Sequence, residues 1–222
     1  MTPVGFVLAT VAPLLSELGF RKRAGMIFTY DLSPEMLGWV GLNRATDAHD
    51  PGAVEINPVI GVRHQPLERL VAELKGMKFH AYNPPTVCIP LGYLLSEGKY
   101  TAWFFRDGEV TEAGRDLVTN VASHGIPFMR SVVDLPNLRQ RIEGRTGFDH
   151  QLEYRLPVAW LLSGEPERAL ATLDDIARVH GTRSDRAAME FLKFADALRS
   201  RLGHSAHDGG RQQHPPRTPW TR

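Results

Sequence analysis

The sequence predicts an α+β protein, in which a mostly antiparallel sheet of about five strands is flanked by helices and followed by a C-terminal helical subdomain. Short segments with period-two alternation, separated by turn residues, fill much of the first half of the chain. From Tyr154 onward, apolar residues recur at helical spacing instead. The chain has 222 residues, of which 42% are hydrophobic, so it is long enough to bury a core without disulfides.

The first segment is predicted to be an amphipathic helix that begins at Thr2-Pro3 and ends at Gly19. Glu17 interrupts its apolar run, and neither a basic region nor a small-residue cleavage site accompanies it, so a packed helix is favoured over a membrane anchor. The apolar stripe consists of Val4, Val7, Val11, Leu14, Leu15 and Leu18.

Three strands are predicted next. Residues 26–30 alternate in polarity and are joined to residues 36–45 through the turn "LSPE", which favours a hairpin. The segment Val54–Arg63 alternates over its whole length, with Arg63 on the face opposite the apolar residues. Because Pro58 has no N–H for a ladder, this strand is expected at a sheet edge or at a bulge.

The middle of the chain mixes helices and strands. Pro66 begins a predicted helix that Gly76 ends, and residues 84–95 and 100–108 supply two further strand candidates. The next helix is expected from Thr111 to Ser123, with Gly125 as its stop. A short helix then follows its expected cap Asp134, with Gly144 past its end.

The C-terminal part is predicted to be helical. Two helices meet at Ser163-Gly164-Glu165, and a third is expected to begin at the cap Ser184. We therefore divide the chain into an α+β domain over 1–150 and a helical subdomain over 151–202 that packs on it. Residues 203–222 are polar and rich in glycine and proline, so a disordered tail is expected there.

One resemblance lies in "AWLLSGEPERALATLDDIA", residues 159–177. The placement of Ala159, Trp160, Gly164 and Ala169 resembles the inter-helix turn of a tetratricopeptide repeat, in which a small residue lets two helices approach closely. The sequence carries one such hairpin, whereas a solenoid needs about three stacked units. The resemblance therefore implies a helical hairpin and does not imply a concave peptide groove.

A second resemblance lies at the N-terminus. A helix ending in "LGFRKR", followed by an aromatic strand, resembles the beginning of small bacterial domains of unknown function. Some of those families occur near toxin–immunity or defence genes. The resemblance implies an immunity-like accessory role and transfers no catalytic residues.

The strand-to-helix corner at Arg63 and His64 is the first candidate site. The unpaired amides and the dipole at a helix N-terminus favour anions. An arginine and a titratable histidine beside them suit a carboxylate or a phosphate. The alternative is structural, with Arg63 paired to a surface acid and His64 closing the corner.

Arg130 and Arg155 extend this candidate site. Each arginine stands among aromatic and apolar residues, and a cleft between the sheet and the helical subdomain is expected to bring both to its wall. The alternative is again structural, with each arginine buried against an acid such as Asp134 or Glu153.

Other chemistry has little support in the sequence. Cys88 lies in a predicted buried strand, where a free cysteine usually acts as a small hydrophobe. The nine histidines form no HExxH or HxH pairing, so no metal is expected. No GxGxxG, Walker-type or GxSxG motif occurs, so no cofactor is expected.

Two functions remain, and the sequence favours the first. The first is a non-catalytic interaction or immunity-like accessory protein in the bacterial cytoplasm, with another protein as its partner; the single cysteine suits a reducing compartment. The second is a small enzyme or anionic-ligand binder that uses Arg63, His64, Arg130 and Arg155. The net charge of +1 gives no support for nucleic acid or an anionic membrane. A polar cluster in a deep pocket favours the second function, and an exposed apolar patch without one favours the first.

Overall fold

The computed structural model describes residues 3–46, 50, 52–106, 110–146 and 149–208. It confirms the α+β fold with a helical C-terminal region. The first elements are α1 (Pro3–Glu17), β1 (Arg21–Lys22), β2 (Ile27–Ser33), β3 (Met36–Arg44), β4 (Val54–His64), α2 (Gln65–Leu74), β5 (Val87–Pro90) and β6 (Trp103–Phe105). A helical half follows, with α3 (Val110–Asn120), α4 (Ile126–Arg130), α5 (Leu135–Glu143), α6 (Asp149–Leu162), α7 (Pro166–His180) and α8 (Arg186–Asp208).

The sheet has the strand order β1-β2-β3-β4-β5, and β6 pairs with β4 beside β5. All of these pairs are antiparallel. The hairpin expected from the turn "LSPE" is confirmed, since β2 and β3 pair through Ser33 and Met36. The longest ladder joins β3 to β4, from Met36–His64 to Arg44–Ile56, without a register shift.

The expectation that Pro58 marks an edge strand or a bulge is wrong, because β4 has neighbours on both sides. The carbonyl oxygen of Val62 accepts a hydrogen bond from Thr86 N, so the backbone N–H and C=O of Val62 point to the β5 side of β4. Pro58 lies four residues earlier and therefore faces the same side. On that side, β4 pairs with β6 up to Ile56 and with β5 from Val59 onward. Pro58 lies between these two paired segments. Its missing N–H costs no ladder hydrogen bond at that position.

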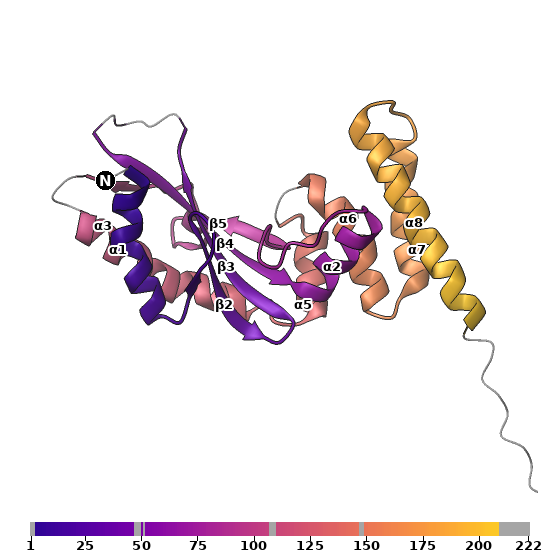
Figure 1. Cartoon of the computed structure of the whole chain (residues 1–222), viewed down its shortest axis with the longest axis horizontal. Helices are drawn as coiled ribbons and strands as arrows, with labels where there is room; N and C mark the ends of the chain where they lie inside the picture. The colour runs from indigo at the N-terminus through magenta and orange to yellow at the C-terminus, as the bar shows by residue number, and fades with distance from the viewer. Residues whose placement is uncertain (1–2, 47–49, 51, 107–109, 147–148, 209–222) are drawn as a thin grey trace, which may run out of the picture.

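One face of the sheet packs against α1 and α3, which lie side by side (Figure 1). The predicted stripe of the first helix is confirmed, since Val7, Val11 and Leu15 are fully buried. The expected stop at Gly125 is wrong: a π-helical turn over Val121–Gly125 leads directly into α4. A Cβ on Gly125 would lie 3.2 Å from Ile60 Cδ1, so the glycine allows the helix to approach the sheet closely.

The C-terminal helices continue the core. Ala169 of α7 is fully buried, and Phe191, Phe194 and Leu198 of α8 are buried as well. The predicted cap Ser184 is wrong by one residue, because Asp185 Oδ1 accepts from Ala188 N at 3.1 Å. The backbone of residues 203–208 continues α8, so the predicted tail cannot begin at 203, and residues 209–222 lie outside the described part of the chain.

The molecule is elongated, with α1 and α3 at one end and the α7–α8 pair at the other (Figure 1). The loop of residues 77–86, called the 77–86 loop below, covers the second face of β4 near the end of the strand. Among the described helices, none combines the length and the apolar character that a membrane span requires. The division into domains at residue 150 stays a prediction.

Candidate functional site

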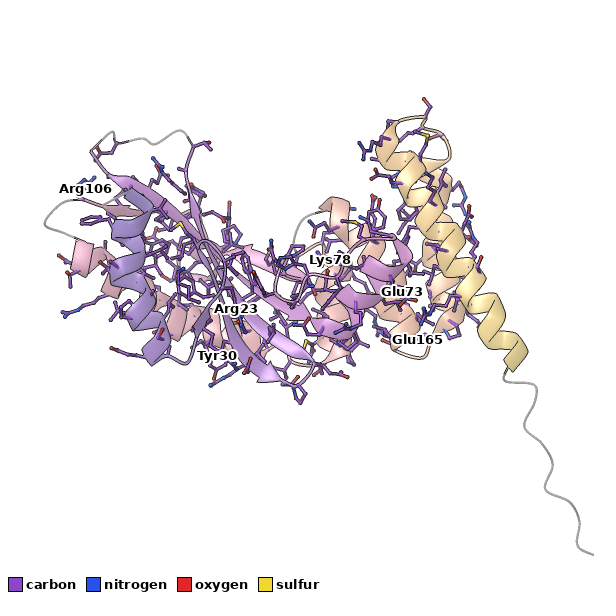
Figure 2. The ribbon with its side chains drawn as sticks, viewed as in Figure 1. Arg23, Tyr30, Glu73, Lys78, Arg106 and Glu165 are labelled. Carbon is purple, nitrogen blue, oxygen red and sulfur yellow. The ribbon has the colours of Figure 1, made fainter. Side chains whose placement is uncertain are left out.

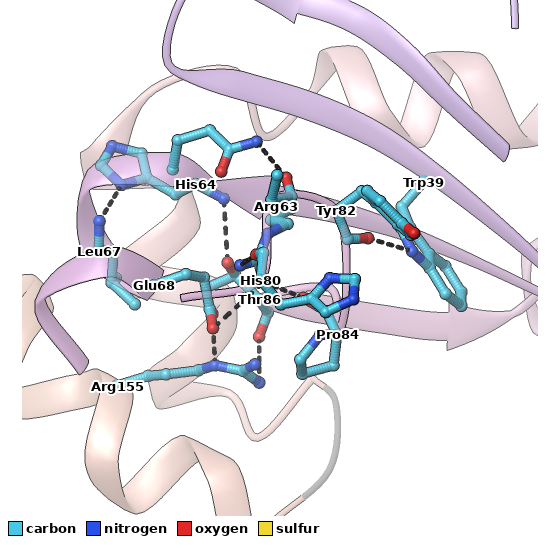
Figure 3. Close-up of polar contacts among 12 residues, drawn as sticks. Trp39, Arg63, His64, Leu67, Glu68, His80, Tyr82, Pro84, Thr86 and Arg155 are labelled. Carbon is cyan, nitrogen blue, oxygen red and sulfur yellow. Dashed lines mark hydrogen bonds and ion pairs between the residues drawn. The ribbon is translucent and has the colours of Figure 1, made fainter. Parts of the chain in front are cut away.

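Three buried charged side chains meet where β4 passes into α2. Arg63 is the second-last residue of β4, Glu68 lies in the first turn of α2, and Arg155 comes from α6. Glu68 Oε2 lies 3.4 Å from Arg63 Nη1, and Glu68 Oε1 lies 2.7 Å from Arg155 Nε. The two arginines are 1% and 2% exposed, so water screens their charges little (Figure 3).

The 77–86 loop holds these side chains in place. Arg63 donates to the backbone oxygens of His80 and Pro84, and Arg155 donates to Thr86 O at 3.0 Å (Figure 3). Trp39 of β3 donates to Tyr82 O at 3.0 Å and fixes the loop to the sheet. The loop therefore covers the face of β4 opposite the apolar residues. Arg63 pairs with the buried Glu68, so the alternative in which it pairs with a surface acid is wrong.

The buried charges do not balance. Two guanidinium groups share one carboxylate, which leaves one positive charge without a buried anion among the described residues. Burial lowers the pKa of Arg63 to about 10, Glu68 opposes that change, and the nearby Arg155 adds to it. An anion placed beside the arginines would relieve this excess of positive charge.

A cavity of about 290 Å³ opens beside this cluster, between α2, α6 and the 77–86 loop. We call it the α2–α6 pocket. Lys75 and Lys78 add two further cations to its wall, and Glu68 is the one carboxylate among its described lining residues. Lys78 lies between the sheet and the C-terminal helices (Figure 2). The remaining lining residues are Val71, Ala72, Met77, His80, Asn83, Pro84, Gln151 and Tyr154, with Arg63 and Arg155 completing the set.

His64 lies next to the pocket and does not line it. Its Nδ1 accepts from Leu67 N at 3.0 Å, so the side chain caps α2 (Figure 3). Its backbone N–H donates to Thr86 Oγ1 at 3.0 Å. Burial lowers the pKa of His64, although Glu35 and Glu68 act against this. His64 therefore has the structural role that the sequence left as an alternative: it closes the corner between β4 and α2.

Arg130 is not part of the site. It is exposed at the end of α4, and its Nη2 donates to Tyr30 Oη at 3.4 Å. Tyr30 lies away from Lys78 in the molecule (Figure 2). The expected acidic partners are also wrong, because Asp134 caps α5 and Glu153 lies 2.8 Å from His180 Nε2.

The sequence reasoning missed Glu68, Lys75 and Lys78. One signal for two of them was present. Glu68, Val71, Ala72 and Lys75 are spaced by three, four and seven residues, so they form one line along α2. This line adjoins the apolar stripe of α2 and has a charged residue at each end. The positions of Lys78 and of the loop carbonyls had no such periodic signal.

Cys88 is buried in β5, and burial raises the pKa of its thiol to about 11. The thiolate that nucleophilic chemistry needs is therefore disfavoured at neutral pH. Across the parts of the chain that the structure describes, no three His, Cys, Asp or Glu side chains lie close enough to hold a metal ion.

Searches against protein-family models, curated proteins and solved structures found no match to this chain. The likeness to a tetratricopeptide hairpin and to small bacterial domains therefore stays a prediction. The helical hairpin on which the tetratricopeptide likeness depends is present: α6 and α7 are joined through Gly164, whose φ is 77°.

Proposed function

We propose that the protein binds a small anionic ligand, a carboxylate or a phosphate, in the α2–α6 pocket. The observation that carries this proposal is the buried pair Arg63 and Arg155, which share the single carboxylate of Glu68 beside an open cavity. Lys75 and Lys78 on the same wall add to the positive potential. The volume of about 290 Å³ lies near the lower end of the range for small-molecule pockets, ~300–1,000 Å³.

This proposal develops the second of the two functions that the sequence left open, with Arg63 and Arg155 retained from the four candidate residues. A polar cluster in a pocket was the feature that separates a ligand binder from an interaction protein. The partner protein, the immunity-like role and the cytoplasmic location expected from the sequence stay predictions. A pull-down from the native host tests the partner.

Calorimetry with acetate, pyruvate and inorganic phosphate at constant ionic strength tests the proposal. At least one anion is expected to bind the wild-type chain. Lys78→Gln removes an exposed cation from the pocket mouth and should weaken that binding about threefold to fivefold, which is about 0.6–1 kcal/mol. Lys99→Gln is the matched control, since Lys99 is 68% exposed and pairs with Glu97 elsewhere.

A second variant tests the buried charges directly. Glu68→Gln leaves Arg63 and Arg155 without their carboxylate, so a bound anion should raise the thermal midpoint of this variant more than that of the wild type. The proposal fails if none of the three anions binds the wild-type chain, or if the anion stabilises the Glu68→Gln variant no more than the wild type.

A further inference from the structure

Lys75 occupies a distinctive place in the α2–α6 pocket. It is the C-cap residue of α2, it is partly buried, and its side chain lies against the face of Tyr154. Lys75 Nζ is 3.8 Å from the centroid of that ring. Lys78 lines the same pocket but is exposed, so the two lysines differ in environment within one cavity.

No described carboxylate lies within ion-pair distance of the Lys75 ammonium. Both acids of α2 have other partners: Glu68 is engaged by Arg63 and Arg155, and Glu73 pairs with Arg201 at 2.6 Å. An aromatic face compensates a buried ammonium less well than a carboxylate does. The side chain is thus a partly desolvated amine beside a buried arginine, and no ion-pair partner among the described side chains holds it charged.

The charged groups around Lys75 act in both directions. Burial is the largest cause of the lowered pKa of Lys75; Arg155 of α6 adds to it, while Glu190 of α8 and Glu68 of α2 oppose it. An ordinary lysine amine, with a pKa of ~10.4, is less than ~0.1% unprotonated at pH 7. Lys75 therefore carries more free amine at neutral pH than such a lysine, and the free amine is the nucleophilic form.

We propose that Lys75 forms an imine with the carbonyl group of a small anionic ligand, an aldehyde acid or a keto acid, whose carboxylate lies against Arg63 and Arg155. This inference rests on the proposed anion binding and names the ligand class. The Nζ lone pair attacks the carbonyl carbon and forms a carbinolamine. The C–O bond then breaks, and the carbonyl oxygen leaves as water with the two amine hydrogens, so no oxidant or reductant takes part.

Reductive trapping tests the proposal. The full chain is incubated at neutral pH with glyoxylate or with propanal, a neutral aldehyde, and the imines are reduced with sodium cyanoborohydride. Peptide mass mapping then gives the labelling rate at each lysine. The rate at Lys75, divided by the rate at the exposed Lys99, is expected to exceed ten with glyoxylate and to be several times smaller with propanal. Lys78 is expected to label at nearly the rate of Lys99.

Variants separate the chemistry from folding. Lys75→Arg keeps the positive charge on Tyr154 but cannot form an imine, so it should lose the pocket adduct. Lys99→Met should leave the Lys75 adduct unchanged. Equal labelling of Lys75 and Lys99, or equal Lys75 to Lys99 ratios with the two aldehydes, overturns the proposal. Anion binding without a Lys75 adduct overturns this inference alone, whereas the absence of anion binding also overturns the proposed function.

Discussion

At the scale of single residues, Glu68 supplies the negative charge that compensates the two buried arginines of the pocket. Its two oxygens contact Arg63 and Arg155 from elements that lie far apart in the sequence. Removing one partner of a buried ion pair costs more than the pair contributes, because the remaining charge stays desolvated. Glu68 has two such partners, so its loss leaves two buried arginines without a compensating negative charge.

Glu68→Gln is therefore expected to lower the free energy of unfolding by about 3–5 kcal/mol in urea denaturation. Glu73→Gln, on the same helix, is the matched control: Glu73 is 60% exposed and pairs with Arg201, so its change should cost less than about 1 kcal/mol. Similar small costs for both variants would show that the buried charges are better solvated than the contacts indicate.

His64 links the stability of the α2 N-terminus to pH. The pKa of His64 is lowered in the folded protein, so the folded state binds fewer protons than the unfolded chain, whose histidine titrates near 6.5. The free energy of unfolding should thus fall as the pH decreases below about 6.5, until the folded-state pKa is reached. The physical reason is that Nδ1 must stay unprotonated to accept from Leu67 N.

His64→Asn keeps a side-chain cap and removes the titration. Urea melts of the wild type and the variant between pH 7.5 and 5 should show that the wild type loses more stability over this range. The comparison cancels the contributions of the groups that the two proteins share. Parallel pH profiles of the two proteins would contradict the role of His64.

At the scale of elements, small residues determine how closely helices approach. Ala169 on α7 is fully buried against α6, as the sequence pattern predicted. Gly125 has the same effect between a π-helical turn and β4, but sequence rules treat glycine first as a helix stop. A glycine required for close packing and a glycine required for a positive φ look alike in a sequence.

Ala169→Trp should separate α6 from α7 and cost about 1–3 kcal/mol or more through overpacking. Chemical denaturation measures the change. Ala171→Trp on the exposed side of the same helix is the control and should cost much less. Equal effects of the two substitutions would mean that helix propensity, and not packing, determines the result.

At the scale of the whole molecule, one cluster of buried side chains runs from α1 to α8. It includes Val7 near the N-terminus and Leu202 near the C-terminal end of α8. The helices α2, α5 and α6 connect the sheet to the α7–α8 pair (Figure 1). Arg155 also crosses this junction, because it reaches from α6 to Glu68 and Thr86.

A fragment ending at Thr146 is therefore expected to lack a cooperative thermal transition. It retains the strands but loses Arg155 and the α6 surface that covers α2 and α5. Circular dichroism melts of the fragment and the full chain test this. A fragment that melts as cooperatively as the full chain would identify an independent α+β domain, as the sequence division suggests.

Local periodicity by itself determined much of this protein. Apolar spacing along the chain predicted the first helix, the β2–β3 hairpin, the strand from Val54 and the α6–α7 hairpin, because residues on one face of an element recur at its own period. Helix ends with a local chemical signal, such as Pro66 and Asp134, were also predictable.

Tertiary structure alone decided the rest. Arg63 is buried because residues 77–86 fold over β4, and it meets Arg155 only because α6 packs on α2. Pro58 is tolerated in a central strand because β5 and β6 leave a gap beside it. Each outcome depends on which distant segment covers a given side chain. Sequence periodicity describes the faces of one element and carries no information about what lies against them.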